Sequence, residues 1–344
     1  AEEIVSASGT SIPANGLIEI VSLNEDGTAT IKTDLPYGRY YVQEIATDSH
    51  YKLSDAKYPI IFEYVGQDTA VVKIAVNDGK AIKNDLIYGS VSGKKVDEDG
   101  NALGGAMIGL FRTDDGEFTK ENALMTTTSA EEGSFSFENI PCGTWYVREI
   151  EQPTGFVLDD TIYPVTIGTD GQVVEIEIVN EYGRGNIHLT KVDSEYPDNK
   201  LTGAVFEVYK DSNNNGKLDD SDELLGTLTE KEIGEYGMND LFYGRYFIKE
   251  TKAPDGFVLD TDVYEVVIDT DGKTYDVENK AGVGFINEVM RGNLKIVKTS
   301  SDGKVKGFAF RITGANGYDI ILETDENGEI FLDGLRIGDY TISE

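Results

Sequence analysis

The sequence predicts an all-β protein made of several β-sandwich domains in tandem. Three observations support this: segments in which apolar and polar residues alternate, turn sequences such as DEDGN, DTDGK and DENGE between them, and a pattern that recurs along the chain. Alternation with a period of two is typical of strands that bury one face, and we find no helical period of useful length. The recurrence length, about 100 residues, matches an immunoglobulin-like sandwich.

The composition excludes several classes of partner. The 344 residues include 30 Lys and Arg against 63 Asp and Glu, which gives a formal net charge of −33. Nucleic acids and anionic membranes attract basic proteins, so we expect neither as a partner. We expect no membrane insertion, because no apolar run approaches the roughly 18 residues that span a bilayer. The single cysteine, Cys142, rules out an intrachain disulfide.

A seven-residue phrase of the form Gly-x-aromatic-x-(Val/Ile)-x-Glu occurs four times. It reads GRYYVQE, GTWYVRE, GRYFIKE and GDYTISE, and its copies end at Glu44, Glu149, Glu250 and Glu344. The aromatic residue, the aliphatic residue and the glutamate share one parity, so a strand that buries the first two also buries the carboxyl group. A buried carboxylate is unfavourable without a partner. The phrase therefore predicts a partner for each glutamate.

Recurring lysines and asparagines are the candidates for that partner. Each recurring lysine shares parity with the apolar residues before it, and these lysines are Lys95, Lys191 and Lys298. Each recurring asparagine ends a closing segment, and these asparagines are Asn84, Asn180 and Asn287. A complete domain therefore aims one Lys, one Glu and one Asn into its core from three different strands.

This combination of side chains suits one specific reaction. Burial disfavours the charged forms, which lowers the pKa of the lysine and raises that of the glutamate. A neutral amine is a nucleophile, the Asn carboxamide carbon is its electrophile, and a protonated glutamate can polarise the carbonyl and carry protons. Contact between the groups raises their effective concentration. The predicted product is a Lys–Asn isopeptide bond with release of ammonia. The alternative is a buried Lys–Glu ion pair with a hydrogen-bonded Asn.

The repeats predict four domains with the boundaries 1–88, 89–182, 183–289 and 290–344. The two complete triads are Lys95, Glu149, Asn180 and Lys191, Glu250, Asn287. The first domain offers Glu44 and Asn84 without a lysine, and the last offers Lys298 and Glu344 without an asparagine, so we assign neither a bond. We expect a fragment of a longer chain; the alternative is strand exchange between the last and first domains of two chains.

Further motifs follow in the same order in each repeat. They are KKVDEDG and TKVD at the lysines, GAMIGLF and GAVFEVY after them, EQPTGFVLD and KAPDGFVLD after the glutamates, and the closing segments that end in Asn. This ordered set resembles the collagen-adhesin B-type (SpaA-like pilin) domains of Gram-positive surface proteins. The resemblance implies prealbumin-like, seven-stranded sandwiches with Glu-assisted, autocatalytic isopeptide bonds. It also implies a secreted protein displayed on the cell wall.

We therefore expect a structural stalk segment of a cell-wall adhesin or pilin-like protein, with neighbouring domains of the same longer protein as its partners. Its only chemistry is a single self-cross-linking event in each complete domain, so we do not expect an enzyme. A cross-link from the first strand to the last destabilises the unfolded chain by roughly 4–5 kcal/mol. Two alternatives remain open: a ligand-binding adhesin module that recognises a host glycan or matrix protein, and a non-catalytic arm of a larger surface enzyme.

One acidic loop, DSNNNGKLDDSDE, predicts a metal site. Asp211, Asn213, Asn215 and Asp222 fall on ligand positions of an EF-hand-like calcium loop, with Asp in place of Glu at position twelve. The loop is also similar to the calcium loops of serine-aspartate-repeat B-type adhesin domains. We expect structural calcium here and no required cofactor elsewhere. The alternative is a solvated acidic loop that connects two strands.

Overall fold

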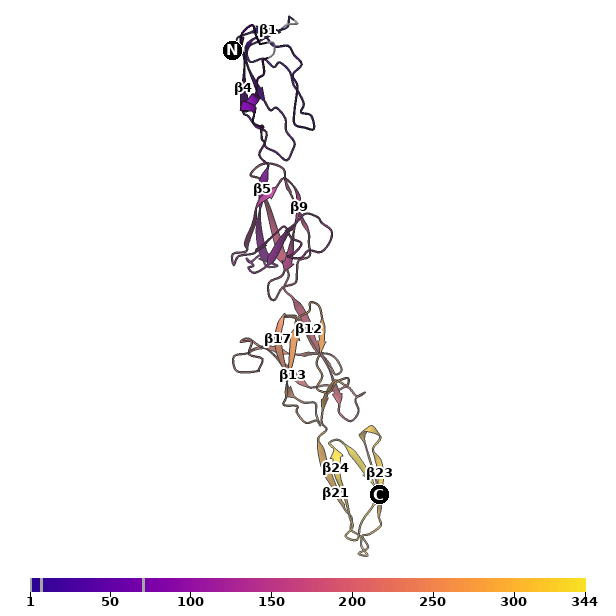
Figure 1. The fold of residues 1–344 in the computed structure, drawn as a ribbon. Coiled ribbons are helices and arrows are strands. Elements are labelled where there is room, and N and C mark those ends of the chain that lie inside the picture. The colour runs from indigo at the N-terminus through magenta and orange to yellow at the C-terminus, as the bar shows by residue number, and fades with distance from the viewer. Residues whose placement is uncertain (1, 7–8, 70–71) are drawn as a thin grey trace. The chain divides into compact units, whose positions relative to one another are not determined.

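The computed structural model describes residues 2–6, 9–69 and 72–344 (Figure 1). Over this range the regular structure consists of short strands and two single-turn 3-10 helices, so the predicted all-β class is confirmed. Backbone contacts divide the chain into two compact units. The first unit holds most of the residues up to 178, and the second holds 179–344 together with the short segments 96–101 and 151–159.

The first predicted domain contains the smallest amount of paired strand. Its elements are β1 (Ile4–Val5), β2 (Ser11–Ile12), β3 (Gly38–Gln43), β4 (Lys57–Phe62) and the 3-10 helix η1 (Val76–Gly79). β1 pairs with β2, and β3 pairs with β4, both in the antiparallel sense. β3 carries the first six residues of the first copy of the Glu phrase, and half-buried and exposed residues alternate from Gly38 to Val42.

The second predicted domain is a two-layered sandwich. Its strands are β5 (Tyr88–Asp97), β6 (Met107–Phe111), β7 (Met125–Thr128), β8 (Ser134–Pro141), β9 (Gly143–Glu151), β10 (Tyr163–Ile167) and β11 (Val173–Asn180). One sheet has the order β10-β9-β6-β7 and the other the order β11-β5-β8. Ile108, Leu110, Val147 and Ile178 are among the residues that fill the core, and all four are fully buried.

The third predicted domain repeats this arrangement with longer sheets. Its strands are β12 (Arg184–Asp193), β13 (Val205–Lys210), β14 (Glu223–Thr227), β15 (Thr229–Glu232), β16 (Glu235–Phe242), β17 (Gly244–Lys252), β18 (Val263–Ile268), β19 (Thr274–Asp276) and β20 (Phe285–Asn287). One sheet has the order β15-β16-β12-β19, with β20 also on β12, and the other has the order β14-β13-β17-β18. Phe206 packs edge-on against both Tyr236 and Phe285 in the core between them.

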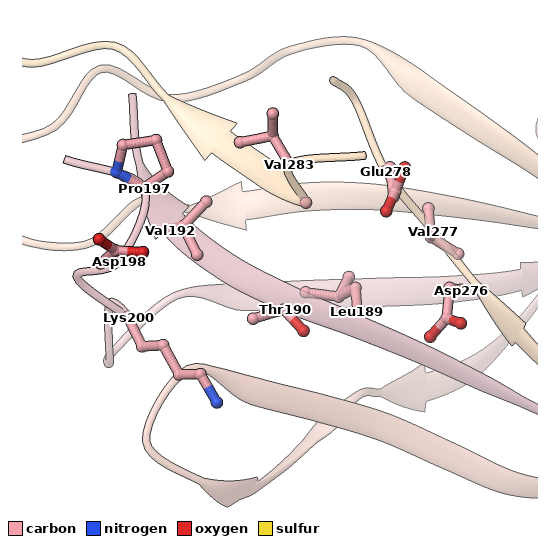
Figure 2. Close-up of a pocket in the computed structure, with 11 residues that line it drawn as sticks. Leu189, Thr190, Val192, Pro197, Asp198, Lys200, Asp276, Val277, Glu278 and Val283 are labelled. Atoms are coloured by element: carbon pink, nitrogen blue, oxygen red, sulfur yellow. The ribbon is translucent and has the colours of Figure 1, made fainter. Parts of the chain in front are cut away.

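The closing segment differs between these two domains. In the second domain it is the single eight-residue strand β11, whereas in the third it is split into β19 and β20, of three residues each. Both short strands pair with β12 in the parallel sense. Residues 277–284 leave the sheet between them, and Gly282 and Gly284 have the positive φ values, 70° and 124°, that this excursion requires. A pocket of about 460 Å³ lies beside β12 at the interruption (Figure 2).

The last predicted domain contributes β21 (Arg291–Val297), β22 (Ala309–Gly314), the 3-10 helix η2 (Ala315–Gly317), β23 (Asp319–Glu323), β24 (Glu329–Arg336) and β25 (Tyr340–Ser343). β21 pairs with β24, and β22 lies between β23 and β25 in a separate sheet. The fourth copy of the Glu phrase forms β25 and the residue after it.

The aromatic residue of the phrase makes the same hydrogen bond in all four copies. Its polar atom donates to the backbone carbonyl four residues earlier: Tyr40 to Pro36 (2.5 Å), Trp145 to Pro141 (2.8 Å), Tyr246 to Phe242 (2.6 Å) and Tyr340 to Arg336 (3.0 Å). An aromatic side chain with a polar tip fills the core and also satisfies the turn before its strand. This explains why Tyr or Trp, and never Phe, occupies the position.

Candidate functional site

The lysine of the third domain lies inside the sandwich. Lys191 is on β12, and its side chain is 0% exposed. Ile187 and Leu189 precede it at two-residue intervals and are also buried. Since alternate residues of a strand face the same side, the strand that directs these two into the core also directs the lysine there.

Glu250 reaches the same place from the opposite sheet. It lies on β17 behind Tyr246 and Ile248, which share its parity, and its side chain is also 0% exposed. Its Oε1 is 3.7 Å from Lys191 Nζ. Its Oε2 accepts a hydrogen bond from the backbone N–H of Asp260 (2.9 Å). The two carboxyl oxygens therefore have different surroundings, one facing the amine and the other a backbone donor.

Asn287, at the end of β20, completes the group. Its Nδ2 donates to Glu250 Oε2 (2.7 Å) and to the backbone carbonyl of Val258 (2.7 Å). Among the described residues, its Oδ1 accepts no hydrogen bond. The structure thus brings the three predicted residues together, with the amide nitrogen, rather than the carbonyl oxygen, turned towards the carboxyl group.

Burial shifts the protonation equilibrium of Lys191 towards the neutral amine. Loss of water on burial lowers the pKa of this lysine to about 8, although the nearby Glu250 and Asp260 act in the opposite direction. At pH 7 roughly one molecule in ten therefore carries the uncharged amine. The nitrogen donates to the carbonyl of Phe285 (3.1 Å) and lies 4.9 Å from the centroid of that ring.

The second domain contains the same lysine–glutamate contact. Lys95 on β5 and Glu149 on β9 are both 0% exposed, and Lys95 Nζ lies 3.7 Å from Glu149 Oε1. Asn180, at the end of β11, is buried, and its Nδ2 donates to the carbonyl of Val157 (2.6 Å). This repeats the bond that Asn287 makes, because the two carbonyls belong to the same position of the repeated GFVLD motif.

The incomplete sets of the end domains are also brought together. Asn84 Nδ2 donates to Glu44 Oε1 (2.7 Å) in the first domain. Lys298 Nζ lies 2.9 Å from Glu344 Oε2 in the last, where the side chains are 22% and 47% exposed. Both pairs are therefore in contact. The Lys298–Glu344 pair is partly exposed to solvent, whereas the lysines and glutamates of the two complete triads are buried.

The acidic loop between β13 and β14 gathers its predicted side chains. Asp211, which is 0% exposed, and Asp222 both accept hydrogen bonds from backbone N–H groups of the loop. The amide nitrogens of Asn213 and Asn215 donate hydrogen bonds to Asp219. Asp219 stands at position nine of the loop and was not among the ligands predicted from the sequence. No group of three or more His, Cys, Asp or Glu in the described part of the chain is arranged to hold a metal. Calcium in this loop stays a prediction.

Comparison with known families agrees with the repeat. A family model described as "SpaA: Prealbumin-like fold domain" matches residues 3–80, 89–182, 185–281 and 292–344, which together make up nearly the whole chain. The chain belongs to this SpaA family. Four SpaA domains thus follow one another in it, and the predicted resemblance to SpaA-like pilin domains is confirmed.

Two curated proteins that are similar to this chain are much longer than it is. Colossin-A of Dictyostelium discoideum is 24% identical over 98% of this chain and 3% of its own length. The trypsin-resistant surface T6 protein of Streptococcus pyogenes is 26% identical over 40% of this chain and 29% of its own. The chain therefore spans less than a third of either relative. Within the described residues, no helix is long and apolar enough to cross a membrane.

One solved structure gives the same fold, and a second is similar over part of the chain. The Bacillus anthracis TIE protein is 22% identical, with a TM-score of 0.57, and the match covers 96% of this chain and 61% of that one. GBS52, the minor pilin of the Gram-positive pathogen Streptococcus agalactiae, is 18% identical, with a TM-score of 0.25, over 59% of this chain and 96% of its own. The match to the TIE protein shows a shared fold alone.

Proposed function

We propose that the chain is a load-bearing stalk segment of a secreted, cell-wall-displayed adhesin or pilin-like protein, reinforced by two self-made isopeptide bonds. The bonds join Lys95 to Asn180 and Lys191 to Asn287. The observation that carries the proposal is the buried contact of Lys191, Glu250 and Asn287, in which one carboxyl group touches both an amine and an amide. A Lys–Glu ion pair with a purely structural role does not need an amide hydrogen bond to the second carboxyl oxygen of the glutamate.

The geometry supports a mechanism in which Glu250 relays protons from the amine to the leaving amide nitrogen. Transfer of a proton from the lysine ammonium to Oε1 leaves a neutral amine, which burial favours. Lys191 Nζ then attacks Asn287 Cγ, and as the Nζ–Cγ bond forms the Cγ–Nδ2 bond breaks. Glu250 takes the second amine proton at Oε1, and its Oε2, which is 2.7 Å from Nδ2, gives a proton to that nitrogen, so that ammonia leaves and Glu250 ends protonated. The sequence also predicts that the glutamate polarises the carbonyl of the asparagine. The amide orientation in the structure does not require this role.

Mechanical reinforcement follows from where the bonds lie. Each one joins the first strand of a sandwich to its closing strand, so tension that enters at the lysine leaves at the asparagine without passing through the strands between them. The bond also closes a loop comparable to a long disulfide loop, which destabilises the unfolded chain by roughly 4–5 kcal/mol. An amide resists reduction, which suits a chain with a single cysteine.

The experiment that tests this is the intact mass of the denatured chain. Two bonds remove two ammonia molecules, a deficit of about 34 Da. Glu149→Ala and Glu250→Ala should each restore about 17 Da, and the double variant should restore the full mass. A full mass in the unmodified chain would show that the buried lysines and glutamates form ion pairs only.

A second candidate function, ligand binding, is favoured by one observation in the first domain. Tyr37 and Tyr64 are each 59% exposed, and their rings lie 6.1 Å apart beside Phe62. Exposed aromatic groups of this kind are frequent at binding surfaces. Binding of the chain to a host glycan array or to matrix proteins, lost in the Tyr37→Ala/Tyr64→Ala variant, would support this function over a passive stalk.

A further inference from the structure

Asn279 supports the short strand that carries the reacting amide of the third domain. Its Oδ1 accepts a hydrogen bond from the backbone N–H of Ile286 (2.7 Å), and its Nδ2 donates to the carbonyl of the same residue (2.8 Å). It thus satisfies both backbone groups of the residue next to Asn287, as a neighbouring strand would. β20 is only three residues long, so this side chain replaces pairing that the strand itself lacks.

Asp260 connects this support to the carboxyl group. Asn279 Nδ2 also donates to Asp260 Oδ2 (2.8 Å), which accepts a second bond from Tyr264 (2.7 Å). The backbone N–H of Asp260 in turn donates to Glu250 Oε2 (2.9 Å). The contacts therefore form a closed circuit: from Glu250 through Asp260 and Asn279 to the strand of Asn287, and from the amide of Asn287 back to Glu250.

The same group of residues also reaches the lysine. The ring of Tyr264 packs edge-on against Phe285 with the centroids 5.0 Å apart, and the carbonyl of Phe285 accepts the hydrogen bond from Lys191. Two negative groups, Glu250 and Asp260, act on Lys191 and raise its pKa against the effect of burial. Asp260 is therefore coupled to the nucleophile by charge and to the electrophile by hydrogen bonds.

We propose that Asn279 and Asp260 are positioning residues for isopeptide formation in the third domain, an inference that rests on the proposed function. They hold the amide of Asn287 against Glu250. The leaving nitrogen, Nδ2 of Asn287, therefore stays within hydrogen-bond distance of the carboxyl group that protonates it. Neither residue exchanges atoms with the reacting groups. Misplacement of reacting groups by about 1 Å slows a reaction by up to about 100-fold, so loss of this support affects the rate strongly.

The second domain provides a control within the same chain. Asp159 and Tyr163 occupy the positions of its repeat that match Asp260 and Tyr264. Its closing strand β11 is uninterrupted, so it contains no counterpart of Asn279. A change at Asn279 should therefore slow one bond and leave the other at its normal rate.

The test follows both bonds while the chain refolds. Chain recovered unreacted from inclusion bodies is diluted out of denaturant, and cross-linked peptides are quantified by mass spectrometry over time. In Asn279→Ala we expect the Lys191–Asn287 bond to form about 10- to 100-fold more slowly, with the Lys95–Asn180 bond unchanged. The matched control is Lys280→Ala, a change to an exposed side chain of the same loop that should alter neither rate.

A pH profile separates positioning from a general loss of strand stability. Asp260→Asn removes a negative charge beside Lys191, so the midpoint of the pH–rate profile should move to lower pH, while Asn279→Ala should leave the midpoint in place. If Asn279→Ala fails to fold, Tyr264→Phe keeps the ring and removes one donor to Asp260, and should still slow the bond. Equal rates in all variants overturn the inference and leave the proposed function standing. Absence of both bonds in the unmodified chain overturns the proposed function itself.

Discussion

Removal of the reacting amide should give the third domain a pH-dependent stability that the unmodified protein lacks. In Asn287→Ala the bond cannot form, and Lys191 stays a free amine in the core, with its pKa lowered to about 8 by burial. The ordinary value, near 10.4, applies in the unfolded chain. Between these two values the unfolded state binds more protons than the folded state, so the free energy of unfolding rises with pH. The full change amounts to roughly 3 kcal/mol and is lost again as the pH falls through 8.

The assay compares Asn287→Ala with a double variant, Asn287→Ala/Lys191→Met, so that other groups titrating in this range cancel. Pulse proteolysis in urea, with cleavage read in peptides of residues 183–289, gives the unfolding free energy between pH 7 and pH 10. We expect the single variant to gain stability over this range relative to the double variant, by about 2 kcal/mol or more. Parallel curves for the two variants would refute the argument that burial depresses the pKa of Lys191.

Three further changes test other parts of the structure. Glu149→Gln should abolish the bond of the second domain and lower the free energy of unfolding of that domain by roughly 4–5 kcal/mol. The fluorescence of Trp145, the only tryptophan, reports the unfolding. Gly93→Ala places a methyl group about 2.0 Å from a core phenylalanine ring and should cost about 1–3 kcal/mol. Gly168→Ala, whose methyl group would only touch Gln172 Oε1 at 3.9 Å, should be neutral in the same melts. Calcium should raise the melting temperature of the unmodified chain but not of Asp222→Ala; equal shifts would exclude the predicted site.

Much of the candidate site could be predicted because strands have a simple rule. A period of two fixes which residues of a strand share a face, so the burial of Lys191 and Glu250 follows from the apolar residues beside them. The order of the repeats then brings the first, middle and closing strands of one sandwich together. No α-helix interrupts this alternation in the described residues.

The remaining parts depend on contacts that have no period. Asn279 lies in a segment that only the third domain contains, so comparison between the repeats gives no signal for it. The division of the closing segment into β19 and β20 depends on two glycines in left-handed conformations, which an apolar pattern does not reveal. Asp260 could have been found, because Asp ends the GFVLD motif in both complete domains. Its role becomes visible only when its contacts to Asn279 and Glu250 are known.

The arrangement of the site also bears on the order of folding and the proposed reaction. Lys191, Glu250 and Asn287 come from β12, β17 and β20, which lie far apart in the sequence, so the triad exists only in the assembled sandwich. In that state the buried amine is unfavourable when charged, as its lowered pKa shows. In the proposed reaction, conversion of the amine to an amide removes the ionisable group of Lys191 from the core. The proposed bond therefore removes the unfavourable buried ammonium of Lys191, and this can happen only once, in the folded state.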